Sequence, residues 1–236
     1  MRLTSLIFIS LISIFNKYAY SAELFGPHES HLIYDGNRSS ITFKVDNTGK
    51  MPWLVQSWVE DINESKTQAF SVIPSLFRVE PSSQFSAKVI KKNTIPEDKE
   101  SIFWVVTNSL PGGKKEEEKN SEGNINAKLS LAYRFKVPMI YRPSSLKGLK
   151  KQPELLEWTV MNEERKIKVH NPTKHVMQLQ YVSIKGEKKQ GNGISFMIAP
   201  MANAMLSIAG NSGEKIKYGI VNDYGAIKEY EGIIDN

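Results

Sequence analysis

Short runs in which apolar and polar residues alternate recur along the first half of the chain. Ile41, Phe43 and Val45 are each separated by one polar residue, which is the period-two pattern of a half-buried β-strand. Strand-like runs predict strands at residues 31–35, 40–45, 53–59, 69–73, 85–90 and 102–106. Turn sequences such as Asp35-Gly36-Asn37 separate them, and short strands at this spacing are typical of an immunoglobulin-like β-sandwich.

The longest alternating run covers residues 125–137, which exceeds the usual length of a strand. One side of its upstream half carries the apolar residues Ile125, Ala127, Leu129, Leu131 and Tyr133. Two interpretations are open. The run can be a central strand of the sandwich, or its upstream half can extend to an edge and offer bare apolar side chains to a partner.

A second series of strand-like runs follows Pro143, which has no backbone amide to continue regular ladder bonding. We interpret residues 144–153 as a linker and predict strands at residues 155–161, 166–170, 176–184, 194–198, 205–209, 216–221 and 227–230. The expected fold is therefore all-β, with one immunoglobulin-like domain at residues 22–143 and a smaller one at residues 144–236.

The first residues have the organisation of a secretory signal peptide. Arg2 precedes an apolar run at residues 6–15 that is too short for a lasting membrane span. Small residues at Ala19 and Ser21 fit a cleavage site, so residues 1–21 are the predicted signal and the mature chain begins at Ala22. Cleavage after Ala22 is the alternative. No later stretch is apolar enough to span a bilayer, and we expect export without stable membrane insertion.

Composition narrows the chemistry that is open to the chain. It contains no cysteine, which removes thiol nucleophiles and the usual structural zinc sites. The formal net charge is +6, but the lysines are scattered, so we expect solubility and mild steering toward acidic partners rather than nucleic-acid binding. The common catalytic and nucleotide-binding spacings are missing from the sequence, and this disfavours an enzyme.

Histidines and paired acids give no sign of a metal or cofactor site. His28 and His31 are three residues apart, but they stand at the entrance to a strand without a nearby third ligand. His170 and His175 flank a predicted turn, where we expect solvent-facing side chains. For turn-region acids such as Glu60, the expectation is solvation or ion pairing.

Several segments, taken in order and spacing, resemble the periplasmic chaperones of the chaperone-usher pilus pathway. The matching segments are Ile33-Tyr34-Asp35-Gly36, Pro52-Trp53-Leu54-Val55-Gln56-Ser57-Trp58-Val59-Glu60, Arg78-Val79-Glu80-Pro81, Pro96-Glu97-Asp98-Lys99-Glu100-Ser101-Ile102-Phe103-Trp104, Ile140-Tyr141-Arg142-Pro143, Asn171-Pro172-Thr173 and Val221-Asn222-Asp223-Tyr224-Gly225. They span nearly the whole predicted mature chain.

The resemblance implies a boomerang of two immunoglobulin-like domains whose cleft holds a pilus or fimbrial subunit that lacks its last strand. The long strand with Ile125, Ala127, Leu129, Leu131 and Tyr133 would fill that gap by donor-strand complementation. The complex would then be delivered, in the periplasm, to an outer-membrane usher, with no nucleotide or metal required. Because the chain has no cysteine pair around the loop before this strand, it is more similar to the short-loop branch of the family.

The resemblance also implies two groups of site residues. His31 falls where the family has an arginine, and Lys136 is the preferred match to a lysine late in the donor strand. Together these two would anchor the terminal carboxylate of the subunit. Glu100, Arg142 and Asp223 fall where the family has an interdomain charge network, which would set the angle between the domains.

Two functions from other classes compete with this interpretation. A pilus subunit or adhesin is also a β-sandwich protein, but it usually needs an N-terminal donor extension and a single incomplete sandwich. A secreted β-sandwich hydrolase would need a paired acid and base, and the sequence offers no such pair. We therefore expect a subunit-binding chaperone rather than either alternative.

Overall fold

The computed structural model describes residues 24–112, 131–161 and 166–236. In these ranges the chain consists of strands joined by loops, with two short 3₁₀ turns, η1 (Ser144–Leu146) and η2 (Pro153–Leu155). The predicted signal peptide and three of the predicted donor residues, Ile125, Ala127 and Leu129, lie outside the described residues.

Two facing sheets form the first domain. One has the order β1 (Phe25–Pro27), β3 (Ser40–Asn47), β7 (Ser83–Lys91) and β5 (Phe70–Ile73). The other has the order β2 (Leu32–Asp35), β9 (Tyr133–Arg142), β8 (Ser101–Pro111), β4 (Trp53–Glu60) and β6 (Leu76–Val79). Neighbouring strands are antiparallel except β2 and β9, which run parallel.

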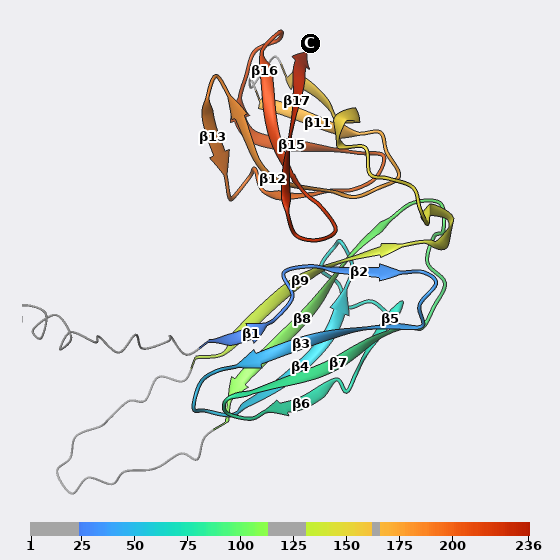
Figure 1. Ribbon diagram of the computed structural model, residues 1–236, viewed down its shortest axis with the longest axis vertical. Helices are drawn as coiled ribbons and strands as arrows, with labels where there is room; N and C mark the ends of the chain where they lie inside the picture. The colour runs from blue at the N-terminus through green and yellow to red at the C-terminus, as the bar shows by residue number, and fades with distance from the viewer. Residues whose placement is uncertain (1–23, 113–130, 162–165) are drawn as a thin grey trace, which may run out of the picture.

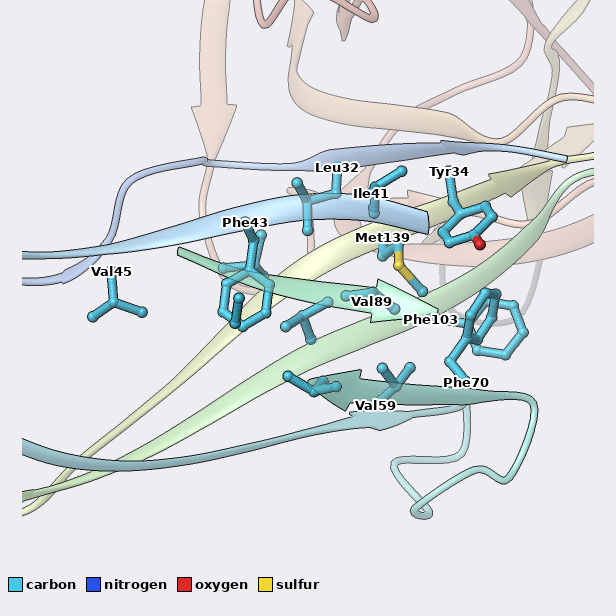
Figure 2. Packing of buried hydrophobic residues seen from close by; sticks show 14 of the residues in the cluster. Leu32, Tyr34, Ile41, Phe43, Val45, Val59, Phe70, Val89, Phe103 and Met139 are labelled. Carbon is cyan, nitrogen blue, oxygen red and sulfur yellow. The ribbon is translucent and has the colours of Figure 1, made fainter. Parts of the chain in front are cut away.

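The core of this domain lies between the two sheets. Phe43 and Val89 point inward from β3 and β7, and Val59, Phe103 and Met139 meet them from β4, β8 and β9 (Figure 2). Burial of each large apolar side chain contributes about 2 kcal/mol to folding. The alternation that predicted the strand at residues 40–45 is thus explained, since its apolar positions are the buried ones.

The second domain closes around its own core. Its strands are β10 (Glu157–Met161), β11 (Lys166–Asn171), β12 (Met177–Ile184), β13 (Glu187–Gln190), β14 (Phe196–Ile198), β15 (Ala202–Ala209), β16 (Lys215–Val221) and β17 (Ile227–Asp235). They follow the order β13-β12-β16-β17-β10-β11-β15, and β14 also pairs with β12. Trp158, Leu179 and Tyr218 are among its fully buried side chains.

Figure 1 shows the two sandwiches at an angle to each other, joined at one end by the segment that carries η1 and η2. The loop between β16 and β17 reaches from the second domain back toward the first. This arrangement confirms the predicted all-β class with two immunoglobulin-like sandwiches. It also brings charged residues of both domains together in the region where the domains meet, the interdomain joint.

Candidate functional site

A charged cluster lies where the two domains meet. Arg142 ends β9, Glu100 immediately precedes β8, and Asp223 lies in the β16–β17 loop. Arg142 Nε donates to Glu100 Oε1 at 2.5 Å, and its Nη1 and Nη2 donate to the two oxygens of Asp223 at 2.5 and 3.0 Å. The structure therefore brings together the three residues that the resemblance placed in an interdomain network.

A fourth residue, Lys151 in the linker, completes the cluster. Its Nζ lies 2.8 Å from Asp223 Oδ1, and sequence reasoning did not single it out. Burial raises the pKa of Asp223, but hydrogen bonds from Arg142 and Lys151 outweigh it and hold that pKa well below the usual value. Burial likewise opposes the charge on Arg142, yet Asp223 and Glu100 raise its pKa. Asp223 and Arg142 therefore both stay charged through the neutral range.

Apolar side chains and a backbone hydrogen bond support the same joint. Ile102 and Ile140 of the first domain pack with Val176 of the second in a buried cluster. The backbone amide of Glu100 donates to the carbonyl oxygen of Lys174 at 2.9 Å. The joint thus combines apolar burial with directional bonds, which favours one relative placement of the domains.

His31, the first predicted anchor residue, also contacts the second domain. Its Nε2 lies 3.1 Å from the backbone oxygen of Asp223, and because a carbonyl oxygen only accepts, the hydrogen is on Nε2. Gly225 lies close to the same ring and has a φ of +83°, a conformation that favours glycine. His31 is therefore part of the contact between the two domains.

Lys136, the second predicted anchor residue, lies on the same face of its sheet as His31. The parallel register begins with Leu32 opposite Met139. If this register is extended by one residue, His31, which immediately precedes β2, falls opposite Pro138, two residues along β9 from Lys136. Two residues of a strand span about 7 Å. The two predicted anchor residues are near each other, but each already has an acceptor of its own.

Lys136 belongs to a second ion cluster, built around Glu60 at the end of β4. The Nζ of Lys136 lies 2.9 Å from Glu60 Oε2 and 2.8 Å from Glu64 Oε2. Glu60 Oε1 accepts from Arg134 Nη2 at 2.6 Å and from Trp58 Nε1 at 2.9 Å. Burial opposes the charge on Glu60, but the bonds from Lys136 and Trp58 lower its pKa. Glu60 thus forms the ion pairs expected of it, but it is buried, which the turn sequence did not predict.

The predicted donor strand can be followed from Leu131 onward. β9 begins at Tyr133 and pairs with β8 from Tyr133 to Tyr141, whereas β2 covers only Met139–Arg142 on the other side. In the described part of the chain, the first half of β9 therefore has an open edge. Leu131 is 54% exposed and Tyr133 is also exposed.

Further apolar side chains surround the beginning of this edge. The Tyr133 ring packs against Trp53 and Phe25, with ring centres 5.2 and 6.4 Å away. Leu54 and Leu110 face each other on β4 and β8 and are exposed. An open strand edge beside exposed apolar groups is a surface that another strand can extend by backbone pairing.

The four histidines lie in different surroundings. His28 Nδ1 lies 2.7 Å from Asp46 Oδ2, so it and His31 have different partners. His170 Nδ1 lies 2.9 Å from Asn203 Oδ1. The solvent-facing expectation for His175 is wrong, because this side chain is buried and its burial lowers its pKa. Within the described ranges no group of His, Cys, Asp or Glu is arranged to hold a metal ion.

The described residues also include no helix long and apolar enough to cross a membrane.

Comparisons with known proteins point in one direction. Residues 25–147 match the family "Pili and flagellar-assembly chaperone, PapD N-terminal domain", and residues 151–232 match "Pili assembly chaperone PapD, C-terminal domain". The chain is 30% identical over 227 residues to the probable fimbrial chaperone LpfB of Escherichia coli O157:H7, covering 94% of each chain. It is 28% identical over 219 residues to the chaperone protein FimB/FhaD of Bordetella pertussis, covering 87% of this chain and 86% of the relative.

A solved structure extends this similarity to the whole fold. The Salmonella enterica SafA pilin in complex with the SafB chaperone matches with a TM-score of 0.74 and 26% identity. The match covers 91% of this chain and 98% of the other. Both domains are therefore included in the similarity.

Proposed function

The chain belongs to the PapD family of pili-assembly chaperones, and from this premise we propose that it captures a fimbrial subunit by adding β9 to the sheet of the subunit. The residues that enter the subunit are those of the long alternating run, Ile125, Ala127, Leu129, Leu131 and Tyr133. The neighbouring SafB chaperone is in a complex with a pilin, which supports a partner of the same kind for this chain.

The open edge of β9 is the observation that carries the proposal. Tyr133–Pro138 have β8 on one side only, and the exposed Leu131 lies two residues before Tyr133. A subunit that lacks a strand has free backbone groups and an empty apolar groove. Donation completes the ladder and fills the groove, and each buried leucine contributes about 2 kcal/mol.

The anchor and the delivery of the subunit are further parts of the proposal. Lys136, with His31 beside it, holds the terminal carboxylate of the subunit and thereby fixes the register of the donated strand, because a slip by one residue turns every side chain to the other face. The loaded chaperone works in the periplasm and passes the subunit to an outer-membrane usher. No cofactor and no enzymatic step are part of this function.

Substitution of Leu131 tests the donor strand. Leu131→Glu places a charge in the apolar groove of the subunit and is expected to lower capture of a co-expressed fimbrial subunit by about tenfold or more. Leu149→Glu is the matched control, since Leu149 is 56% exposed and lies in the linker outside β9. Full capture by folded Leu131→Glu, checked by circular dichroism, would exclude this strand as the donor.

A further inference from the structure

The ammonium group of Lys136 lies between two carboxylates of its own chain, those of Glu60 and Glu64. We infer that Glu64 occupies, in the free protein, the place at Lys136 that the terminal carboxylate of a captured subunit takes. Glu64 is then an internal competitor that sets the affinity and selectivity of the anchor. The inference rests on the proposed role of Lys136 as the carboxylate anchor.

The two carboxylates differ in how readily they leave. The Glu60 side chain is 4% exposed, and it also accepts hydrogen bonds from Arg134 and Trp58. Removing a buried charge from such partners is costly. The Glu64 side chain is 67% exposed, and exposed pairs are weak and screened by salt. Glu60 therefore remains with Lys136, and Glu64 is the group that can be exchanged.

The loop of Glu64 holds its backbone in place independently of Lys136. Asp61 Oδ1 accepts the backbone amides of Asn63 and Ser65 at 2.9 and 3.1 Å, and the Asp61 amide donates to the Ser65 carbonyl oxygen at 2.9 Å. Within this turn Glu64 adopts a φ of +60°, in the left-handed region. Release of Lys136 then requires only rotation of the Glu64 side chain.

Charge balance explains why an exchange is needed. Lys136 and Arg134 carry two positive charges, and Glu60 and Glu64 carry two negative charges. A further carboxylate would leave this cluster with an excess of negative charge unless Glu64 moves away. Once Glu64 has moved, the incoming carboxylate restores the balance.

Because Glu64 is attached to the same chain as Lys136, its carboxylate has an advantage over small anions in solution. A group on a short loop competes at an effective concentration on the order of millimolar, so dilute monocarboxylates do not displace it. A subunit displaces it because donor-strand pairing brings its terminal carboxylate to Lys136 as part of a larger interface. Glu64 therefore makes the anchor respond to the whole subunit rather than to any free anion.

The first test uses the free protein and needs no subunit. Hydrogen bonds from Lys136 to Glu64 and Glu60 raise the pKa of this lysine. Glu64→Gln should lower the Lys136 pKa, followed by NMR of its side chain. Glu187→Gln is the matched control, because Glu187 is an exposed acid that faces Lys189 at 3.6 Å and should leave Lys136 unchanged. An unchanged Lys136 pKa in Glu64→Gln would overturn the inference.

The second test measures binding of a purified fimbrial subunit. Glu64→Gln should tighten capture by about two- to fivefold at low salt, and the gain should shrink as salt is raised. Glu187→Gln should bind as wild type does. In a Lys136→Met background Glu64→Gln should not change the affinity for the subunit, because the ammonium group for which the two carboxylates compete is absent. Extending the subunit by two glycines, which moves its terminal carboxylate, should also abolish the gain.

The outcomes separate this inference from the proposed function. If wild type captures the subunit and Glu64→Gln binds no more tightly, subunit capture stands and the internal competitor is excluded. A gain that persists without Lys136 would likewise overturn the inference. If wild type captures no subunit while Leu149→Glu and the other variants remain folded, the proposed function fails, and the inference fails with it.

Discussion

Glu100 Oε2 accepts a hydrogen bond from the backbone amide of Val176 at 2.6 Å, so a buried carboxylate of the first domain is bonded to the backbone of the second. Its other oxygen, Oε1, is bonded to Arg142. One side chain therefore links the end of β9, which continues the donor strand, to the second domain. The angle of the joint and the position of the proposed binding edge are coupled through this residue.

Removal of Arg142 should weaken the joint. Arg142→Ala leaves the buried Glu100 without its cation and deprives Asp223 of two hydrogen bonds, with Lys151 as its remaining partner. We expect the free energy of unfolding to fall by about 2–3 kcal/mol, less than for a fully buried pair because Asp223 is partly exposed. Urea unfolding measures the loss, and small-angle scattering should show a wider spread of interdomain distances.

Two further variants make this prediction specific. Arg78→Ala removes an exposed ion pair with Glu80 and should cost well under about 1 kcal/mol. Arg142→Lys should restore only part of the loss, because an ammonium group cannot reach both carboxylates with the planar fork of a guanidinium group. If Arg142→Ala unfolds and scatters as wild type does, the network does not hold the angle.

Acid should weaken the same joint through Asp223. Its pKa in the folded chain is held below the usual value of 3.8, so the stabilisation is fully present above that value and is lost as pH falls toward the folded-state pKa. Asp223→Asn should therefore be less stable than wild type at pH 7, and the difference should narrow below about pH 4. Unfolding free energies of wild type and Asp223→Asn at pH 7, 5 and 3 test this prediction. A stability difference that stays constant over this range would contradict it.

Much of the joint could be predicted from the sequence because its residues stand in local motifs. Asn171-Pro172-Thr173 predicted a turn, and the structure gives the reason. The Asn171 side chain accepts the Thr173 amide at 3.1 Å and donates to the His175 carbonyl oxygen at 2.8 Å. This closed turn places Val176 at the joint. Glu100, Arg142 and Asp223 meet as the resemblance implied.

The parts that sequence reasoning missed depend on contacts between distant segments. The sequence around Glu60 is that of an ordinary turn. Its carboxylate is buried because Arg134 and Lys136 of β9 lie beside it. Lys151 looks like an ordinary linker lysine in the sequence, because its partner Asp223 lies in the distant β16–β17 loop. Strands β1, β6 and β13 were missed because their sequences, FGP, LFRV and EKKQ, show no clean alternation of apolar and polar residues. No local pattern distinguished buried His175 from a solvent-facing turn residue.

Buried His175 should make the protein less stable as pH falls below neutral. Burial is the main cause that lowers its pKa below the usual value of 6.5, Arg142 and Lys151 lower it further, and Glu100 and Asp223 oppose the shift. The unfolded chain then takes up a proton at a higher pH than the folded chain does. Stability is therefore full above about pH 6.5 and falls as pH drops toward the folded-state pKa.

His175→Gln removes this titration and should flatten the stability profile between about pH 7 and pH 5. The matched control is His170→Gln, which changes a histidine on β11 that contacts Asn203 and should leave the slope in place. Unfolding free energies at pH 7, 6 and 5 are the measurement. A wild-type profile that is already flat over this range would show that His175 does not titrate as expected.

His31→Arg should strengthen subunit capture at neutral pH. The guanidinium group can keep a donor for the Asp223 carbonyl oxygen and adds a permanent positive charge on the face of Lys136. An arginine can also bind a carboxylate with two parallel bonds, which an imidazole cannot do. We expect an affinity gain of about tenfold at low salt for a charge-assisted contact, and a smaller gain at high salt. His170→Arg adds the same charge to the second domain and is the control for general attraction of an acidic subunit. Equal gains in the two variants would assign the effect to net charge, and no gain in His31→Arg would restrict His31 to the joint with Asp223.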